Sequence, residues 1–131
     1  MTSEDQKELA RNFMRALDSG DEQAMADLTA PDFRFELMTA APGFPSVLDR
    51  EGFLTNFPQV LKSLLPNGMG FTFATAFSEG PHVSMQGESS TVTAAGRTYT
   101  NRYHWYFRID GGKVAEFKEY MDSYQMLQAF A

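Results

Sequence analysis

The sequence predicts an α+β fold in which helices cover one face of a curved sheet. Apolar residues recur every three or four positions in segments 3–17 and 49–65, as they do along one face of a helix. From Gly70 onward the apolar spacing changes to every second residue, which is typical of strands with one buried face. Because 131 residues with 43% apolar content are one domain's length, we expect residues 1–131 to form a single domain.

The amino-terminal quarter predicts two helices and a strand. We expect the first helix to begin at Ser3, in a capping box with Gln6, and to end at Gly20. A short second helix is expected over 21–28. Aromatic and charged residues then alternate over 33–38, which indicates a strand.

The middle of the chain predicts a loop and a third helix. Proline and glycine indicate a loop over 41–46, and an apolar helical face begins near Asp49. Pro58 lies inside that helical pattern and lacks a backbone donor, so we expect a kink or a new start there.

The second half predicts consecutive antiparallel strands. Phe71, Phe73 and Phe77 alternate with Thr72, Ala74, Ala76 and Ser78, which indicates a strand. Further strands are expected over 82–89, 92–109 with a turn near 94–96, and 113–121, with a short terminal helix from Asp122. Asp110-Gly111-Gly112 indicates a tight hairpin turn.

Composition excludes several function classes. The net charge of −6 repels phosphate backbones and anionic lipids, so neither nucleic acid nor a membrane is expected as a partner. The polar amino terminus is unlike a signal peptide, and we expect a cytoplasmic protein. No cysteine is present, and His82 and His104 lack carboxylates at ligand spacing, so no metal is expected.

The strand around Asn101 carries the first candidate site residues. Tyr99, Tyr103 and Trp105 share its odd-numbered, mostly apolar face, which should point inward. An unpaired buried amide costs about 1–3 kcal/mol, so Asn101 should have a partner. That partner is either loop backbone in the core or a ligand. Tyr103 can donate its hydroxyl to a developing oxyanion, or it is simply a core residue.

Glu119 is the only carboxylate on the expected inner face of the last strand, beside Phe117 and Met121. Desolvation there would raise its pKa and suit it to proton transfer near neutral pH. The alternatives are an ion pair, or solvent exposure through a distorted strand end.

Asp122 stands where the last strand gives way to the terminal helix. The run from Asp122 to Gln125 matches a capping box, so a structural role is expected. Capping does not exclude contact with a pocket, and Asp122 is therefore the second candidate acid–base group.

The segment GRTYTNRYHWYFRIDGGKVAEFKEYMDS resembles the carboxyl-terminal half of SnoaL-like proteins, within the nuclear transport factor 2-like superfamily. Phe33-Arg34-Phe35, Glu51-Gly52-Phe53 and Gly87-Glu88 extend the resemblance over nearly the whole chain. It implies a conical α+β fold, with a curved antiparallel sheet packed on three helices around an apolar pocket, usually in a homodimer.

The resemblance also implies the kind of chemistry. Members of the superfamily include polyketide cyclases, ketosteroid isomerases and dehydratases, and their chemistry is typically acid–base and free of cofactors. Glu119 matches the acid–base glutamate of the phenazine-biosynthesis type, and Asp122 the aspartate of the cyclases. The assisting histidine of the phenazine type has no equivalent near 64–66. Arg97, Arg102 and Arg108 do not fit an epoxide-hydrolase-like set.

We therefore expect an enzyme that isomerises, cyclises or dehydrates an apolar cyclic or polyketide-like molecule, without a cofactor. Glu119 would carry the proton, with Asp122 as the alternative, and Tyr103 with Asn101 would polarise a carbonyl. The expected ligand-binding aromatic residues are Phe35, Phe57, Tyr99 and Trp105. The alternative is a non-catalytic domain that binds a small ligand or only dimerises.

The outer face of the predicted sheet is not fully polar, which favours a homodimer through that face. The residues without an obvious inward role are Ala74, Ala76, Tyr106 and Val114.

Overall fold

The computed structural model describes residues 1–40, 43 and 45–130. Its elements, in chain order, are α1 (Ser3–Ser19), α2 (Glu22–Leu28), β1 (Thr29–Leu37), β2 (Val47–Asp49), α3 (Arg50–Leu64), β3 (Phe71–Glu79), β4 (His82–Val92), β5 (Thr98–Asp110), β6 (Lys113–Met121) and α4 (Ser123–Phe130). The predicted α+β class is thus confirmed. Among these residues, none of the helices has the length and apolar character that spanning a membrane requires.

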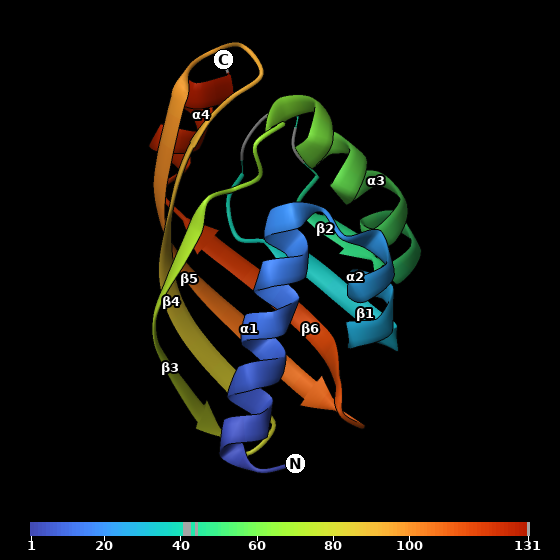
Figure 1. The fold of residues 1–131 in the computed structure, drawn as a ribbon. Helices are drawn as coiled ribbons and strands as arrows, with labels where there is room; N and C mark the ends of the chain where they lie inside the picture. Colours follow the sequence, from blue (N-terminus) through green and yellow to red (C-terminus); the bar gives the residue numbers. More distant parts are fainter. Residues whose placement is uncertain (41–42, 44, 131) are drawn as a thin grey trace.

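The six strands of the described residues form one curved sheet in the order β2-β1-β6-β5-β4-β3. Four of the five neighbouring pairs are antiparallel, but β1 and β6 run parallel, which the expectation of an antiparallel sheet missed. Figure 1 shows α1 crossing the inner side of the sheet, with α2 and α3 beside it and α4 at the end near the carboxyl terminus. The inner face is thereby covered by helices.

Phe13 on α1 lies at the centre of the core. Its ring contacts those of Phe33, Phe53, Phe107 and Phe117 with centroid distances between 5.1 and 6.0 Å. The five rings come from α1, α3, β1, β5 and β6, so the aromatic cluster joins both halves of the chain. Burial of such large rings is a main source of the free energy of folding.

The helix ends differ from the sequence prediction in detail. The capping box at α1 pairs Thr2 with Asp5, not Ser3 with Gln6. Helix α3 continues through Pro58 without a new start, and Pro58 is buried.

The strand limits also shift. β1 begins at Thr29, before the expected residue 33, because its first residues pair with β6 across a register shift. β4 extends to Val92, which therefore belongs to the strand before the turn and not to the one after it. The expected turn follows, and β5 begins at Thr98. The predicted loop residues 41, 42 and 44 lie outside the described part of the chain.

A tight hairpin turn and a carboxylate bound to backbone N–H groups fix the positions of neighbouring elements. Gly111 and Gly112 both have positive φ, 58° and 75°, as a two-residue hairpin of the predicted kind requires. The Asp18 carboxylate, at the end of α1, accepts backbone N–H bonds from Met69, Gly70 and Phe71 at 2.7–3.1 Å. These bonds tie the start of β3 to α1.

Two β-bulges reverse predicted faces. In β3, an extra residue between Phe73 and Ala76 turns Ala76 into the core, so its expected place on the outer face was wrong, and leaves Phe77 64% exposed. In β6, an irregularity opposite Arg108 and Ile109 buries Val114 as well. Ala76 and Val114 therefore do not belong to the outer face. Ala74 remains exposed there and Tyr106 half-buried.

Candidate functional site

A cavity of about 370 Å³ lies between the inner face of the sheet, α3 and α4. This volume is within the range of about 300–1,000 Å³ typical of small-molecule sites. Its walls are mostly aliphatic and aromatic: Phe35, Leu37, Pro45, Leu48, Asn56, Phe57, Val60, Leu61, Leu64, Leu65, Met69, Tyr99, Glu119, Met121, Met126 and Phe130. Among the described lining residues there is no Lys, Arg or His, and Glu119 is the one carboxylate.

Glu119 reaches this cavity from β6. It stands opposite Trp105 of β5 in the sheet, and only 4% of its surface is exposed. The indole Nε1 of Trp105 donates a hydrogen bond to Glu119 Oε2 at 3.0 Å. Its other oxygen, Oε1, has no hydrogen-bond partner in the described part of the chain and is available to a ligand.

Burial raises the pKa of Glu119 to about 7, and the indole hydrogen bond opposes that rise. The ion pair that was an alternative for this residue is not present: within the described residues, Glu119 contacts no cation. A carboxyl group that titrates near neutral pH can both accept and donate a proton under ordinary conditions.

Trp105 lies behind Glu119 and not in the cavity wall. Its side chain is fully buried, is stacked on Tyr103 at 5.1 Å and meets the edges of Phe71 and Phe73. These contacts hold the indole in place. The structure thus assigns Trp105 a contact with the carboxyl group, whereas a ligand contact was expected.

A chain of buried hydroxyls runs beside the cavity. Tyr103 shares hydrogen bonds with Ser89 at 2.9 Å and with Tyr99 at 3.2 Å. Tyr99 lines the cavity, and its ring packs against Phe130 of α4 at 5.2 Å. Tyr103 does not line the cavity, and its hydroxyl is connected to the cavity wall through its hydrogen bond with Tyr99.

Asn101 is satisfied by the protein. Its Nδ2 donates to the Tyr99 hydroxyl at 2.8 Å and to the carbonyl oxygen of Asp122 at 3.0 Å. Its Oδ1 accepts from the backbone N–H groups of Arg102 and Asp122 at 2.7 and 3.0 Å. Of the two alternatives for this buried amide, the geometry favours the structural one, and Asn101 does not line the cavity.

Asp122 is exposed and also lies outside the cavity wall. Its Oδ1 accepts backbone N–H bonds from Tyr124 at 3.0 Å and from Gln125 at 3.4 Å. These are the contacts of a cap on the first turn of α4.

We expect Asp122→Asn to be nearly silent, because asparagine caps a helix about as well as aspartate. Asp122→Ala should lower the free energy of unfolding by about 1 kcal/mol and leave the cavity intact. The measurements are thermal unfolding and the affinity of a hydrophobic fluorescent dye for the cavity. A strong loss of dye affinity in Asp122→Asn would return this residue to the acid–base candidates.

Phe35 and Phe57 line the cavity and contact each other at 5.5 Å between ring centroids. Sequence reasoning did not name the lining residues of the terminal helix and the second half of α3. These are Val60, Leu61, Leu64, Met126 and Phe130. Their helical apolar spacing was visible, but the same spacing describes any core helix.

The two histidines lie on the outer face of the sheet. His82 Nδ1 is 2.6 Å from the Tyr106 hydroxyl, and His104 is hydrogen-bonded to Ser84. Within the described residues, no group of three or more His, Cys, Asp or Glu side chains is arranged to hold a metal ion.

Comparison with known families gives a match over residues 10–117 to the model of the SnoaL-like domain. The chain belongs to the SnoaL-like family. The matched segment holds the first five strands and ends two residues before Glu119. The comparison with curated proteins finds no match to this SnoaL-like chain.

Solved structures show the same fold. An NTF2-like protein from Burkholderia xenovorans LB400 superposes with a TM-score of 0.81 at 16% identity, covering 100% of this chain and 99% of that one. A proposed isomerase from Bacillus subtilis gives 0.83 at 19% identity, covering 97% and 93%. IdmH from Streptomyces antibioticus, a proposed polyketide cyclase, gives 0.78 at 22% identity, covering 95% and 97%. At these identities the likeness concerns the fold alone.

Proposed function

We propose that this SnoaL-like domain is an enzyme that moves a proton on an apolar cyclic or polyketide-like molecule, without a cofactor. The observation that carries the proposal is the Glu119 carboxyl group, which is buried in a mostly apolar cavity with its pKa raised to about 7. The names of two structural neighbours, an isomerase and a polyketide cyclase, are consistent with this chemistry.

The proposed step begins with ionised Glu119. Its carboxylate takes a proton from the carbon next to a substrate carbonyl, and the electron pair of that C–H bond moves toward the carbonyl to form an enolate. Where the enolate is conjugated with a C=C bond, the protonated carboxyl group can return the proton to the far carbon of that system, which is an isomerisation. The enolate carbon can instead attack a second carbonyl, which closes a ring and leaves an alkoxide oxygen that takes the proton from the carboxyl group. Alternatively, the enolate can re-form the carbonyl and expel a β-hydroxyl group, which takes up that proton and leaves as water.

Incorporation of solvent deuterium next to the carbonyl of bicyclic aromatic ketones, with methyl naphthyl ketone as the first probe, tests this proposal. The wild-type protein should accelerate the exchange above the buffer rate, as mass spectrometry can show. Binding of the ketones with no acceleration of exchange would contradict catalysis.

One observation favours the alternative of a non-catalytic ligand-binding domain. Among the described lining residues, Glu119 has no second carboxylate or histidine to pass its proton to. Ligand binding that is independent of the Glu119 ionisation state would favour this alternative.

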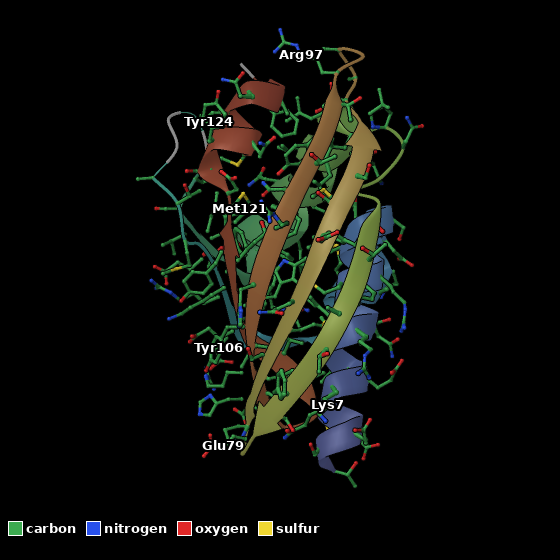
Figure 2. All side chains as sticks on the ribbon, turned by 90° about the vertical axis from the view of Figure 1, so that its left-hand side faces the viewer. Lys7, Glu79, Arg97, Tyr106, Met121 and Tyr124 are labelled. Carbon is green, nitrogen blue, oxygen red and sulfur yellow. The ribbon has the colours of Figure 1, made fainter. Side chains whose placement is uncertain are left out.

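We further propose a homodimer through the outer face of the sheet, on a surface of Ala74, Phe77, Tyr106 and Tyr120. Phe77 and Tyr120 are 64% and 41% exposed. Figure 2 shows Tyr106 projecting from the side of the sheet opposite α1. Light scattering should give twice the chain mass of 14.7 kDa, and Tyr120→Glu should shift the protein toward monomer. A wild-type mass of one chain at micromolar concentration would refute the dimer.

A further inference from the structure

The hydroxyl groups beside the cavity form a chain of hydrogen bonds, and the neighbouring groups determine which hydroxyl donates to which. The chain consists of Ser89, Tyr103 and Tyr99, which are 4%, 4% and 2% exposed. Only Tyr99, at one end, also lines the cavity. Each hydroxyl has one hydrogen to donate, so the order of donation decides which hydrogen is left over.

Asn101 sets the first step of that order. Two backbone N–H groups point at its Oδ1, and the Asp122 carbonyl oxygen lies 3.0 Å from its Nδ2. Exchanging the two amide atoms would place donors against donors and an acceptor against an acceptor, so the orientation is determined. Asn101 therefore donates to the Tyr99 oxygen at 2.8 Å, and Tyr99 accepts that bond.

Three orders remain for the rest of the chain. If Ser89 and Tyr99 both donate to Tyr103, the Tyr103 hydrogen has no acceptor among the hydrogen bonds of the described residues. If Tyr99 donates to Tyr103 and Tyr103 donates to Ser89, the Ser89 hydrogen has no acceptor among the hydrogen bonds of the described residues. If Ser89 donates to Tyr103 and Tyr103 donates to Tyr99, the hydrogen left over is that of Tyr99. A buried donor without a partner is costly, and of these hydroxyls only Tyr99 lines the cavity, where a bound molecule can accept its hydrogen, so the order that leaves the Tyr99 hydrogen over is favoured.

We infer that Tyr99 holds its hydroxyl hydrogen for a bound molecule, and that the ligand is an uncharged compound with a carbonyl or similar acceptor oxygen. The inference rests on the proposed function in that it uses the same cavity. It gives Tyr99 the donor role expected of Tyr103, which becomes a positioning residue that polarises the Tyr99 hydroxyl. The lack of Lys, Arg and His among the described lining residues disfavours an anionic ligand, and the mostly apolar walls make burial of any charged group costly.

The electrostatics of the site agree with a donor role. Burial, and to a lesser extent the nearby Glu119 carboxylate, raise the pKa of Tyr99 and of Tyr103, so both stay protonated. Glu119 and Tyr99 line the same cavity. A carbonyl compound held by Tyr99 would thus have a proton carrier in the same cavity.

The test compares methyl naphthyl ketone with isopropenylnaphthalene, the hydrocarbon in which C=CH₂ replaces C=O. Wild-type protein should bind the ketone about fivefold more tightly than the hydrocarbon, the contribution of one net hydrogen bond. Tyr99→Phe should abolish this preference while hydrocarbon affinity persists. Tyr124→Phe, which removes an exposed hydroxyl from α4, is the matched control and should keep the preference.

A second variant tests the direction of the chain. Tyr103→Phe should weaken ketone binding, because Tyr99 loses the bond that polarises its hydroxyl. The opposite order would free the Tyr99 hydrogen from Tyr103, so stronger ketone binding by Tyr103→Phe would overturn the inference. The infrared carbonyl stretch of the ketone bound to wild-type protein gives a readout that needs no variant. It should lie at lower frequency than in hydrocarbon solvent.

The remaining outcomes separate this inference from the proposed function. Equal affinity for ketone and hydrocarbon, with an unshifted carbonyl stretch, would overturn the role of Tyr99, whereas exchange catalysed by Glu119 would still stand. Failure of both probes to bind would overturn the inference together with the apolar-ligand cavity. Tight ketone binding with a shifted carbonyl stretch but no deuterium exchange would support the donor role of Tyr99 and contradict the proposed catalysis.

Discussion

Glu119→Gln should reduce deuterium exchange into a bound ketone by at least about a hundredfold, the lower end of the usual contribution of a general base. Glutamine has nearly the same shape and can still accept the Trp105 N–H bond, so the cavity should keep its form. It cannot take up a proton at neutral pH. Glu79→Gln, which neutralises an exposed carboxylate at the end of β3, is the control and should leave the rate unchanged.

The pH dependence of the exchange rate should identify the same group. The ionised carboxylate is the base, and its pKa is about 7, so the wild-type rate should rise as pH increases through 7 and level off above it. A rate that levels off near pH 4.5, the ordinary value for glutamate, would show that the active group is not this buried carboxyl.

Protein stability should change with pH in the opposite direction. Between pH 4.5 and 7 the folded protein keeps the Glu119 proton, whereas the unfolded chain has released it. Folding is therefore favoured at low pH, and that contribution, of order 3 kcal/mol, is lost as pH rises through about 7. Glu119→Gln should lack this slope and be at least as stable as wild type at pH 8. Denaturant unfolding measures it, and an unstable variant would contradict the argument.

Gly87→Ala should strongly destabilise the protein and, by moving Trp105, should also change the pKa of Glu119. A Cβ atom at Gly87 would lie 2.4 Å from Trp105 Cζ3 on one side and 2.7 Å from the Thr72 carbonyl oxygen on the other. The buried indole must move, and overpacking of this kind costs about 1–3 kcal/mol. Urea unfolding measures this loss.

Movement of the indole should weaken its bond to the Glu119 carboxyl group, and the pKa of Glu119 should then rise further. The midpoint of the exchange rate against pH should shift upward in Gly87→Ala. Adding Trp105→Phe to Gly87→Ala should recover part of the stability, because the smaller ring leaves room, but should not restore the midpoint. A midpoint unchanged in both variants would show that the indole does not tune this carboxyl group.

Strand alternation made several site residues predictable. Tyr99, Asn101, Tyr103 and Trp105 all occupy the inner face of β5, as the two-residue period indicated. Glu119 is buried on β6 for the same reason. A period of two assigns a side chain to a face, but it does not say which other element covers that face. Only the packing of α3 and α4 decided that Glu119 and Tyr99 line the cavity while Asn101 and Tyr103 lie behind it.

The prediction failed where the period itself was interrupted. Ala76 and Val114 turned inward at bulges, each of which inserts a residue opposite a neighbouring strand. A bulge depends on the partner strand, so one strand's sequence does not reveal it. The parallel pairing of β1 with β6 joins segments about 80 residues apart and was invisible for the same reason.

By itself, the sequence determined the α+β class, the order of most elements and the face of the last strand on which Glu119 stands, because these follow from local periodicity. The tertiary structure alone decided the partners of the polar groups: Trp105 for Glu119, backbone for Asn101, and the Ser89–Tyr103–Tyr99 order of the hydroxyls. Hydrogen bonds need atoms within about 3 Å in a suitable direction. That condition is met between residues that lie far apart in the chain, so local sequence patterns do not predict these bonds.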